Sequence, residues 1–175
     1  GASTGGFSDV LLRRGVAAVV AVDVGYGQLA WPIRSDERVT VLERTNIRDL
    51  TAEALPFAPN LVVGDLSFIS LALVLPPLAA VSTPEADLVL MVKPQFEVGK
   101  EQVGAGGVVR DPALRSDSVR RIAVAAGTLG LGTVGVVASP LPGPSGNVEY
   151  FLHLRRGAPP LDEHDLARAI EEGPR

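Results

Sequence analysis

Three ionisable residues from separate segments of the chain, Asp65, Lys93 and Glu149, together support proton-transfer chemistry. Asp65 ends the apolar segment LVVGD, Lys93 ends LVLMVK, and Glu149 lies near the start of NVEYFLHLRR. A charge at the end of a buried strand costs free energy unless it is solvated, paired or used. A lysine held between carboxylates can accept a proton or stabilise a developing alkoxide, because burial makes its charged form costly.

The elements that must position these residues are apolar strands separated by helical stretches. The sequence predicts strands at 16–24, 38–44, 61–66, 88–93 and 132–141, and helices at about 5–14, 69–81, 112–129 and 162–172. This alternation predicts an α/β fold with a mostly parallel, doubly wound sheet. Asp65 and Lys93 then lie at the carboxyl edge of the sheet, where open α/β folds bind ligands.

The last strand, NVEYFLHLRR, breaks this alternation because only the loop PGPSG separates it from GTVGVVASPL. Two strands joined by so short a loop must be antiparallel. The start of an antiparallel strand falls on the carboxyl edge of its parallel neighbours, so Glu149 is expected beside Asp65 and Lys93. Alternation along the strand predicts one shared face for Val148, Tyr150, Leu152 and Leu154.

Glycines cluster in the opening segment, GASTGGFSD. Gly1, Gly5 and Gly6 allow close backbone approach, and a helix that begins near Gly5 offers N–H groups to an anionic group. The spacing is not G-x-G-x-x-G, which weakens a nicotinamide dinucleotide interpretation. Such a turn follows a central strand in a doubly wound fold, so we expect that strand to lie upstream of the sequence, and the domain to be truncated at its N-terminus.

Two further segments are candidates for the same ligand. Asp23 ends the strand after the glycine-rich turn, where an acidic residue receives ribose hydroxyls in this architecture, although a solvated strand end is the alternative. Asn46 and Asp49 follow VTVLE and could meet an adenine. Turn formation by asparagine and capping by aspartate explain them equally well.

Composition sets broad limits. The 175 residues, 46% of them hydrophobic, suit a single globular domain. There is no cysteine, which excludes disulfides, thiolate metal sites and cysteine nucleophiles, and no signal peptide is visible, so a cytoplasmic setting is expected. The net charge of −4 argues against a uniformly basic nucleic-acid clamp, although local arginine clusters can still contact phosphates.

Two other kinds of site are not expected. The uncharged segment from Leu66 to Pro84 is nearly long enough to span a bilayer, but prolines and hydroxyl residues interrupt it, which favours a core-packed helix and no transmembrane segment. The histidines, His153 and His164, form no cluster with metal-ligand spacing, so no metal site is expected. A packed or edge position suits His153, and a solvated one His164. The glycine-rich segment from Glu97 to Pro112 is the expected mobile loop.

Motifs spread over essentially the whole chain resemble a known family. They are GASTGGFSD, AVDVGYGQLAW, ERTNIRDL, GDLSFISL, MVKPQFEVGK, GGVVRD and GPSGNVEYFLHL. Together they resemble the methyltransferase domain of the TlyA family, the hemolysin-A-like ribosomal RNA 2′-O-methyltransferases, which are related to the FtsJ class. The resemblance implies a Rossmann-like class I methyltransferase fold that binds S-adenosylmethionine.

The resemblance also assigns site residues. The cofactor-binding residues that it implies are Gly1, Ala2, Ser3, Thr4, Gly5, Gly6, Asp23, Asn46, Ile47, Asp49 and Asp65. FtsJ-class enzymes use a Lys-Asp-Lys-Glu tetrad, of which this chain supplies Asp65, Lys93 and Glu149. The first lysine would precede Gly1 and is absent from the sequence, as is the family's S4-like RNA-binding domain. Catalysis is therefore expected to need the upstream segment that carries this lysine.

The implied substrate is the ribose of a cytidine in small- and large-subunit ribosomal RNA, within ribosomal subunits. Ser67 and Phe68 are candidates to shape the nucleoside pocket, and Phe68 can stack on a base, with a core phenylalanine as the alternative. Lys100, Arg110 and Arg115 are candidate phosphate contacts, with a solvated face as the alternative.

Two other function classes stay open. A small-molecule methyltransferase would show a closed lid over the carboxyl edge of the sheet. A membrane-active, hemolysin-type protein or a non-catalytic RNA-binding protein would not depend on Lys93.

Overall fold

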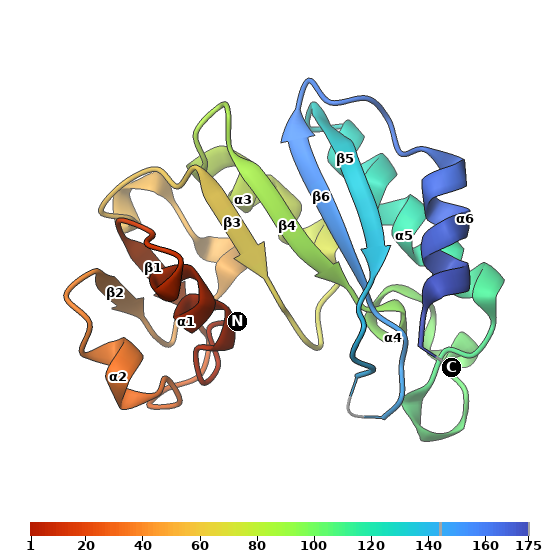
Figure 1. The fold of residues 1–175 in the computed structure, drawn as a ribbon, viewed down its shortest axis with the longest axis horizontal. Helices are drawn as coiled ribbons and strands as arrows, with labels where there is room; N and C mark the ends of the chain where they lie inside the picture. Colours follow the sequence, from red (N-terminus) through yellow and green to blue (C-terminus); the bar gives the residue numbers. More distant parts are fainter. Residues whose placement is uncertain (144, 175) are drawn as a thin grey trace. The chain divides into compact units, whose positions relative to one another are not determined.

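The computed structural model describes residues 1–143 and 145–174, and its internal contacts divide the chain into two compact units. The N-terminal unit is Gly1–Ala58 and the C-terminal unit is Pro59–Arg175. The sequence predicts a single domain, whereas the contacts gather separately around the two sets of strands. Each unit has its own sheet (Figure 1).

The N-terminal unit is built on two parallel strands, β1 (Val19–Val22) and β2 (Val39–Leu42). Its helices are α1 (Gly6–Arg13) and α2 (Trp31–Arg34), followed by the 3₁₀ turns η1 (Ile47–Asp49) and η2 (Ala52–Ala54). The sequence analysis did not predict α2, although Pro32 stands in its first turn, where proline is tolerated. The buried core of this unit consists of Leu12, Val19, Ala21, Leu29 and Ile33.

The C-terminal unit contains a four-stranded sheet in the order β3-β4-β6-β5. Its strands are β3 (Leu61–Gly64), β4 (Asp87–Val92), β5 (Leu131–Ala138) and β6 (Tyr150–Arg156). β3 and β4 are parallel, whereas β6 is antiparallel to both β4 and β5. The predicted α/β class, the parallel pairs and the antiparallel last strand are therefore confirmed. In the predicted loop between β5 and β6, Pro144 lies outside the described residues.

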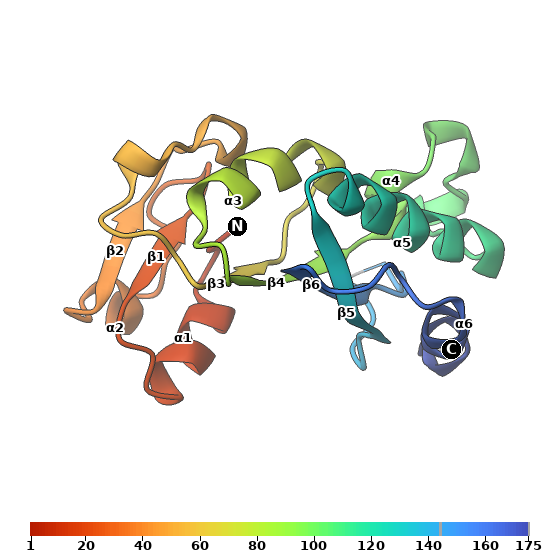
Figure 2. The ribbon, with the colours of Figure 1, turned by 90° about the horizontal axis from the view of Figure 1, so that it is seen from above.

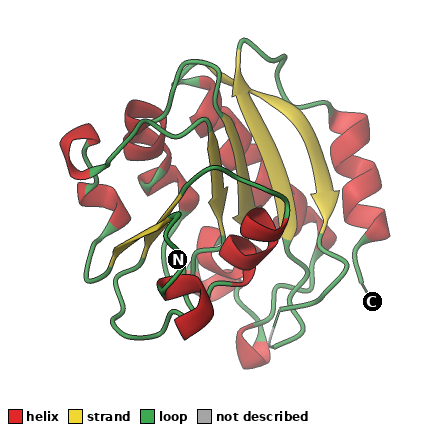
Figure 3. Cartoon of the chain, turned by 60° about the vertical axis from the view of Figure 1, so that its left-hand side comes forward, coloured by secondary structure: helices red, strands yellow, loops and turns green. Residues whose placement is uncertain are grey.

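Helices cover this sheet on one face and at one edge. They are α3 (Leu75–Val81), α4 (Pro94–Glu97), α5 (Pro112–Gly127) and α6 (Glu163–Glu172), with 3₁₀ turns η3 (Leu71–Leu73), η4 (Lys100–Gln102) and η5 (Ala105–Gly107). Figure 2 shows α3 and α5 on the same side of the strands, and Figure 3 separates helices, strands and loops by colour. Tyr150, Leu152 and Leu154 of β6 are fully buried, as their shared face predicts.

Prolines account for one wrong boundary and one helix that the sequence analysis did not predict. The helix expected at 69–81 begins only at Leu75, because Pro76 and Pro77 fit the first turn of a helix and not its interior. Pro94 opens the one-turn helix α4, which was not predicted. The segment from 97 to 112 contains η4 and η5, and the buried side chain of Asn147 accepts from Val109 N and donates to Gly107 O.

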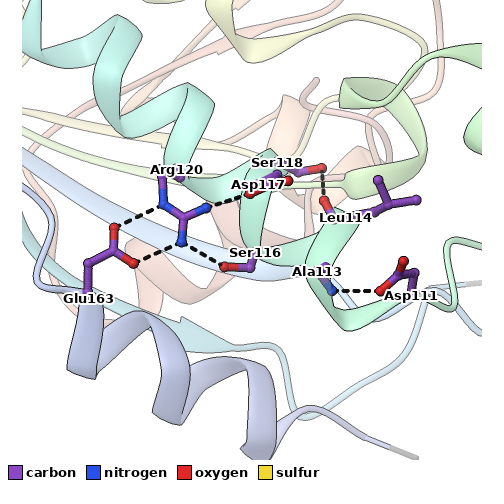
Figure 4. A network of polar contacts seen from close by, with 8 residues as sticks. All are labelled: Asp111, Ala113, Leu114, Ser116, Asp117, Ser118, Arg120 and Glu163. Atoms are coloured by element: carbon purple, nitrogen blue, oxygen red, sulfur yellow. Dashed lines mark hydrogen bonds and ion pairs between the residues drawn. The ribbon is translucent and has the colours of Figure 1, made fainter.

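The C-terminal helix α6 is held to α5 by a polar network (Figure 4). Arg120 of α5 donates to both carboxylate oxygens of Glu163, at 2.9 and 2.8 Å, and also to Asp117 and Ser116. Asp111 caps α5 by accepting from Ala113 N, and Asp162 caps α6 by accepting from His164 N. These contacts fix the helices that frame the sheet.

Candidate functional site

Lys93 is a buried lysine, 9% exposed, directly after the end of β4. Its ammonium nitrogen lies 2.5 Å from Asp65 Oδ1 and 3.9 Å from Glu149 Oε1, and it donates to Ser67 Oγ at 3.3 Å. Asp65 Oδ1 is itself buried, and its contact with Lys93 has ion-pair distance without hydrogen-bond geometry. Lys93 is thus surrounded by oxygen atoms without being locked to any one of them.

Strand pairing explains why these residues meet. β3 and β4 run parallel with Gly64 opposite Leu90, so Asp65 leaves the sheet on the same edge as Lys93. β6 runs antiparallel to β4 with Tyr150 opposite Val92, and therefore the residue before Tyr150 comes beside the residue after Val92. The structure thus brings together the three residues that topology predicts at one edge of the sheet.

Glu149 is more deeply buried than its partner Asp65. Glu149 is 5% exposed, whereas the Asp65 side chain is 41% exposed. Gln95 of α4 donates to Glu149 Oε1 at 3.0 Å, and a side chain at Gly143 would come within 2.8 Å of the same oxygen. The glycine therefore leaves the space that this carboxylate occupies.

A second buried carboxylate, Glu97 of α4, holds the loop that carries Asp65 and Ser67. Glu97 is 7% exposed and accepts from Ser70 Oγ at 2.6 Å and from Leu71 N at 2.8 Å. Burial raises the pKa of Glu97 above its ordinary value, although these hydrogen bonds act in the opposite direction. Sequence reasoning missed both Gln95 and Glu97; their only signal was their position directly after Lys93.

Phe68 lies on the same loop in an uncommon conformation. Its φ of 63° is in the left-handed region, which a bulky side chain rarely adopts, and its side chain is 90% exposed. The ring centroid lies 5.1 Å from that of Phe96. Phe68 is therefore exposed, and the alternative of a core phenylalanine is wrong.

In the N-terminal unit, Asp23 and the glycine-rich segment are joined by hydrogen bonds. Asp23 follows β1, and its carboxylate accepts from Ser3 N at 2.8 Å and from Gly25 N at 2.7 Å. Burial disfavours the charged form of Asp23, but the bonds from Ser3 and Gly25 outweigh it and hold its pKa below the ordinary value. Gly5 adopts a φ of 102° and has no room for a side chain against Ile33.

The remaining predicted cofactor residues differ in their hydrogen bonds and in their exposure. Ala2 N donates to Val22 O, Thr4 O accepts from Ala30 N, and Gly6 begins α1, whose first-turn N–H groups have no acceptor within the helix. Asn46 caps η1 by accepting from Arg48 N, so the cap of this turn is the asparagine and not the aspartate that the alternative interpretation named. Ile47 is half-buried and Asp49 is exposed.

The candidate RNA contacts lie on separate segments of the C-terminal unit. Lys100 begins η4 and is exposed, and Arg110 is exposed with a long 3.4 Å bond to Ala105 O. Arg115 of α5 is half-buried, and its Nε is buried without a hydrogen-bond partner. Burial raises the pKa of Tyr150, and the nearby positive charge of Arg115 acts in the opposite direction by lowering this pKa. Arg115 is thus partly committed to the protein interior.

Neither a metal-binding cluster nor a membrane-spanning helix is found in the part of the chain that the structure describes. Within residues 1–143 and 145–174, no group of histidine, aspartate or glutamate side chains is arranged to hold a metal ion. Among the helices of those same residues, none has the length and apolar character needed to cross a bilayer.

Comparison with known proteins assigns the fold and the family. The family model described as FtsJ-like methyltransferase matches residues 1–156. The Mycobacterium tuberculosis 16S/23S rRNA (cytidine-2′-O)-methyltransferase TlyA is 62% identical over 180 aligned positions, which cover 99% of this chain and 67% of that protein. The chain therefore spans about two thirds of the length of this relative.

Two solved structures are also similar. A Lactococcus lactis protein that carries the name hemolysin superimposes with a TM-score of 0.93 at 40% identity, covering 98% of this chain and 84% of that one. The N-methyltransferase NodS from Bradyrhizobium japonicum, solved in complex with S-adenosyl-L-homocysteine, has a TM-score of 0.60 at 12% identity, covering 88% and 74%. At that identity the likeness concerns the fold, which is that of the class I methyltransferases.

Proposed function

Because the chain belongs to the FtsJ-like methyltransferase family, we propose that it methylates the 2′-hydroxyl of a cytidine ribose in ribosomal RNA, with S-adenosylmethionine as the methyl donor. The observation that carries this proposal is the buried lysine between two carboxylates at the carboxyl edge of the sheet. The 62% identity to a protein named as a 16S/23S rRNA (cytidine-2′-O)-methyltransferase supports the substrate class.

In the proposed reaction, Lys93 acts on the attacking oxygen. A ribose 2′-hydroxyl is a poor nucleophile at neutral pH, so Lys93 takes its proton when it is a neutral amine or, when it is a charged ammonium, stabilises the forming oxyanion. Asp65 and Glu149 hold the lysine and its charge in place, and their unequal exposure leaves Asp65 on the open side. Positioning of the hydroxyl against the methyl donor supplies a large part of the rate.

The residues of the N-terminal unit fit a nucleotide-type cofactor. An ionised carboxylate has about four lone-pair sites, and Asp23 uses its oxygens for the N–H groups of Ser3 and Gly25, so acceptor capacity is left for ribose hydroxyls. The Gly1–Gly6 segment, Asp23 and the Asn46–Asp49 turn would hold the cofactor. When bound, S-adenosylmethionine supplies an electrophilic methyl group.

The exposed side of the site favours a large substrate. Phe68 and the side chain of Asp65 are 90% and 41% exposed, so neither is covered by a closed lid. Phe68 offers a ring for base stacking, and Lys100, Arg110 and the exposed part of Arg115 offer phosphate contacts. We place the reaction in the cytoplasm on ribosomal subunits, with an S4-like domain upstream in the full-length protein.

The test uses the full-length protein that contains this chain, ribosomal subunits and labelled cofactor. Lys93→Ala should abolish methyl incorporation at the ribose while cofactor binding is retained. Arg168→Ala, which removes one positive charge from the exposed face of α6, is the matched control and should keep wild-type activity. Wild-type transfer by Lys93→Ala would refute the mechanism, and vesicle leakage undiminished by this change would favour a membrane-active protein instead.

A further inference from the structure

The one-turn helix α4, directly after Lys93, contacts the site on both sides of the lysine. Gln95 reaches Glu149, Glu97 reaches Ser70 and Leu71, and the ring of Phe96 lies against Phe68. A helix so short presents its consecutive side chains in different directions. The partners of α4 therefore belong to two separate segments, the loop after β3 and the residues just before β6.

Glu97 holds the loop that connects Asp65 to Leu71. Its two carboxylate oxygens accept from Ser70 Oγ and from the buried N–H of Leu71, while its own carbonyl accepts from Arg121 at 2.8 Å. A left-handed φ at a residue such as Phe68 persists only where the surrounding structure determines it. The Glu97 anchor is the contact that fixes the end of this loop, beyond Asp65, Ser67 and Phe68.

Gln95 holds Glu149 by a hydrogen bond. Its Nε2 donates to Glu149 Oε1 at 3.0 Å, whereas Lys93 lies 3.9 Å from the same oxygen. The Gln95 bond is thus the shorter of the two contacts that orient this carboxylate. The side-chain oxygen of Gln95 is buried and has no hydrogen-bond partner, which destabilises the folded protein. The hydrogen bond from the same amide to Glu149 must offset this loss of free energy.

We infer that Gln95 and Glu97 are positioning residues for methyl transfer: Gln95 orients Glu149, and Glu97 fixes the loop that presents Asp65 and Ser67 to Lys93. This inference rests on the proposed function for its kinetic effect. Neither residue needs to touch the substrate, because each acts through a partner of Lys93.

The first measurement is the kinetics of variants at Glu97 in the full-length protein. Glu97→Ala should lower kcat by about a hundredfold, the loss expected when reacting groups are misplaced by about 1 Å, with KM for the cofactor unchanged. Glu97→Gln should restore most of the loss, because the amide can still accept from Leu71 N and can donate to Ser70. Asp162→Ala, which removes the cap of α6 away from the site, is the control and should keep wild-type kcat.

If Glu97→Ala fails to fold, Ser70→Ala provides a milder form of the same test. It removes one hydrogen bond between the loop and Glu97 and should lower kcat by about tenfold, as one bond predicts. Wild-type kcat in Ser70→Ala, or in a folded Glu97→Ala, would overturn the role of Glu97.

The Gln95 contribution is tested by a double-mutant cycle. Gln95→Ala should lower kcat in the wild-type background but cause no further loss when Glu149 is already changed to Gln, because Gln95 acts through Glu149. Equal losses in both backgrounds would overturn this role.

Amide hydrogen exchange separates failure of this inference from failure of the proposed function. Glu97→Ala should speed exchange of the Leu71 amide, whose acceptor it removes, without affecting Val119 in α5. This result is independent of any RNA. Unchanged Leu71 exchange would refute the anchor even in an active enzyme, whereas faster exchange in a protein without methyltransferase activity would refute only the proposed function.

Discussion

The strands β4 and β6 carry a charge cluster at each end, and the two clusters differ in burial and in pairing. At one end, Lys93 and Glu149 are buried and 3.9 Å apart. At the other, Arg155 donates to both oxygens of Asp87, at 2.8 and 3.0 Å, and His153 lies 2.6 Å from the same carboxylate. All three residues of the second cluster are partly exposed.

The difference shows which cluster can support chemistry. Hydrogen bonds from Arg155 and then from His153 hold the pKa of Asp87 below its ordinary value, so this carboxylate stays charged and engaged. Exposed pairs of this kind contribute little to stability. In the Lys93 cluster, Lys93 and Glu149 are buried, and Asp65 is exposed on one side and has no hydrogen bond to Oδ1, so these groups remain able to contact a substrate.

The largest effect is expected from exchanging a carboxylate for its amide at each end. Glu149→Gln should lower kcat by about 10²–10⁴-fold, the usual range for loss of acid–base catalysis, because the amide no longer holds the charge of Lys93. Asp87→Asn is the matched change and should leave methyl transfer at the wild-type level. A comparable loss in both variants would end the distinction between the two clusters.

A smaller loss is expected when Glu149 is kept but displaced. Gly143→Ala adds a methyl group 2.8 Å from Glu149 Oε1, so the carboxylate must shift away from Lys93 and kcat should fall by about tenfold or more. Gly127→Ala, where an added methyl meets no atom within 4 Å, serves as the control. Full activity of Gly143→Ala would show that the position of Glu149 is not critical.

The pH dependence of stability should have opposite signs for Glu97, in α4, and for Asp87. The pKa of Glu97 is raised in the folded protein, so the folded state binds more protons and the free energy of unfolding falls as pH rises from 4.5 through the folded pKa. Glu97→Gln should remove this fall, about 1.4 kcal/mol for each unit of pKa difference. Urea unfolding at a series of pH values measures it, and an unchanged pH profile would contradict the prediction.

The smallest effect is expected at the Asp87 end. Because the pKa of Asp87 is lowered on folding, its contribution is present above the ordinary aspartate pKa of 3.8 and is lost as pH falls through the folded value. Asp87→Asn should therefore destabilise the protein only slightly at neutral pH and not at all in acid. Salt should weaken the effect further, and thermal unfolding at two salt concentrations checks this.

Much of this arrangement could be predicted from the sequence because strand direction follows from loop length. The short connection between β5 and β6 requires them to be antiparallel, which puts Glu149 on the edge of the sheet where Lys93 lies, and the pairing of β6 with β4 then brings the two residues together. The start of α3 and the helix α4 were mispredicted because a proline can end one element or begin the next, and local sequence does not decide between them.

Contacts between distant side chains were beyond prediction. Nothing in KPQFEVG indicates that Gln95 reaches Glu149 or that Glu97 reaches Leu71, since both depend on how loops pack after the strands have paired. The left-handed conformation of Phe68 is also imposed by its surroundings, because a phenylalanine has no local preference for it.

The sequence by itself determined the α/β class, the strand directions and the charged residues that lie near the strand ends, because apolar periodicity and loop length are local properties. Only the tertiary structure decided which charges are buried, which are saturated by partners and which residues hold them. Those properties depend on the summed burial and geometry of several segments, and the contrast between Lys93 and Asp87 exists only after β4 and β6 have paired.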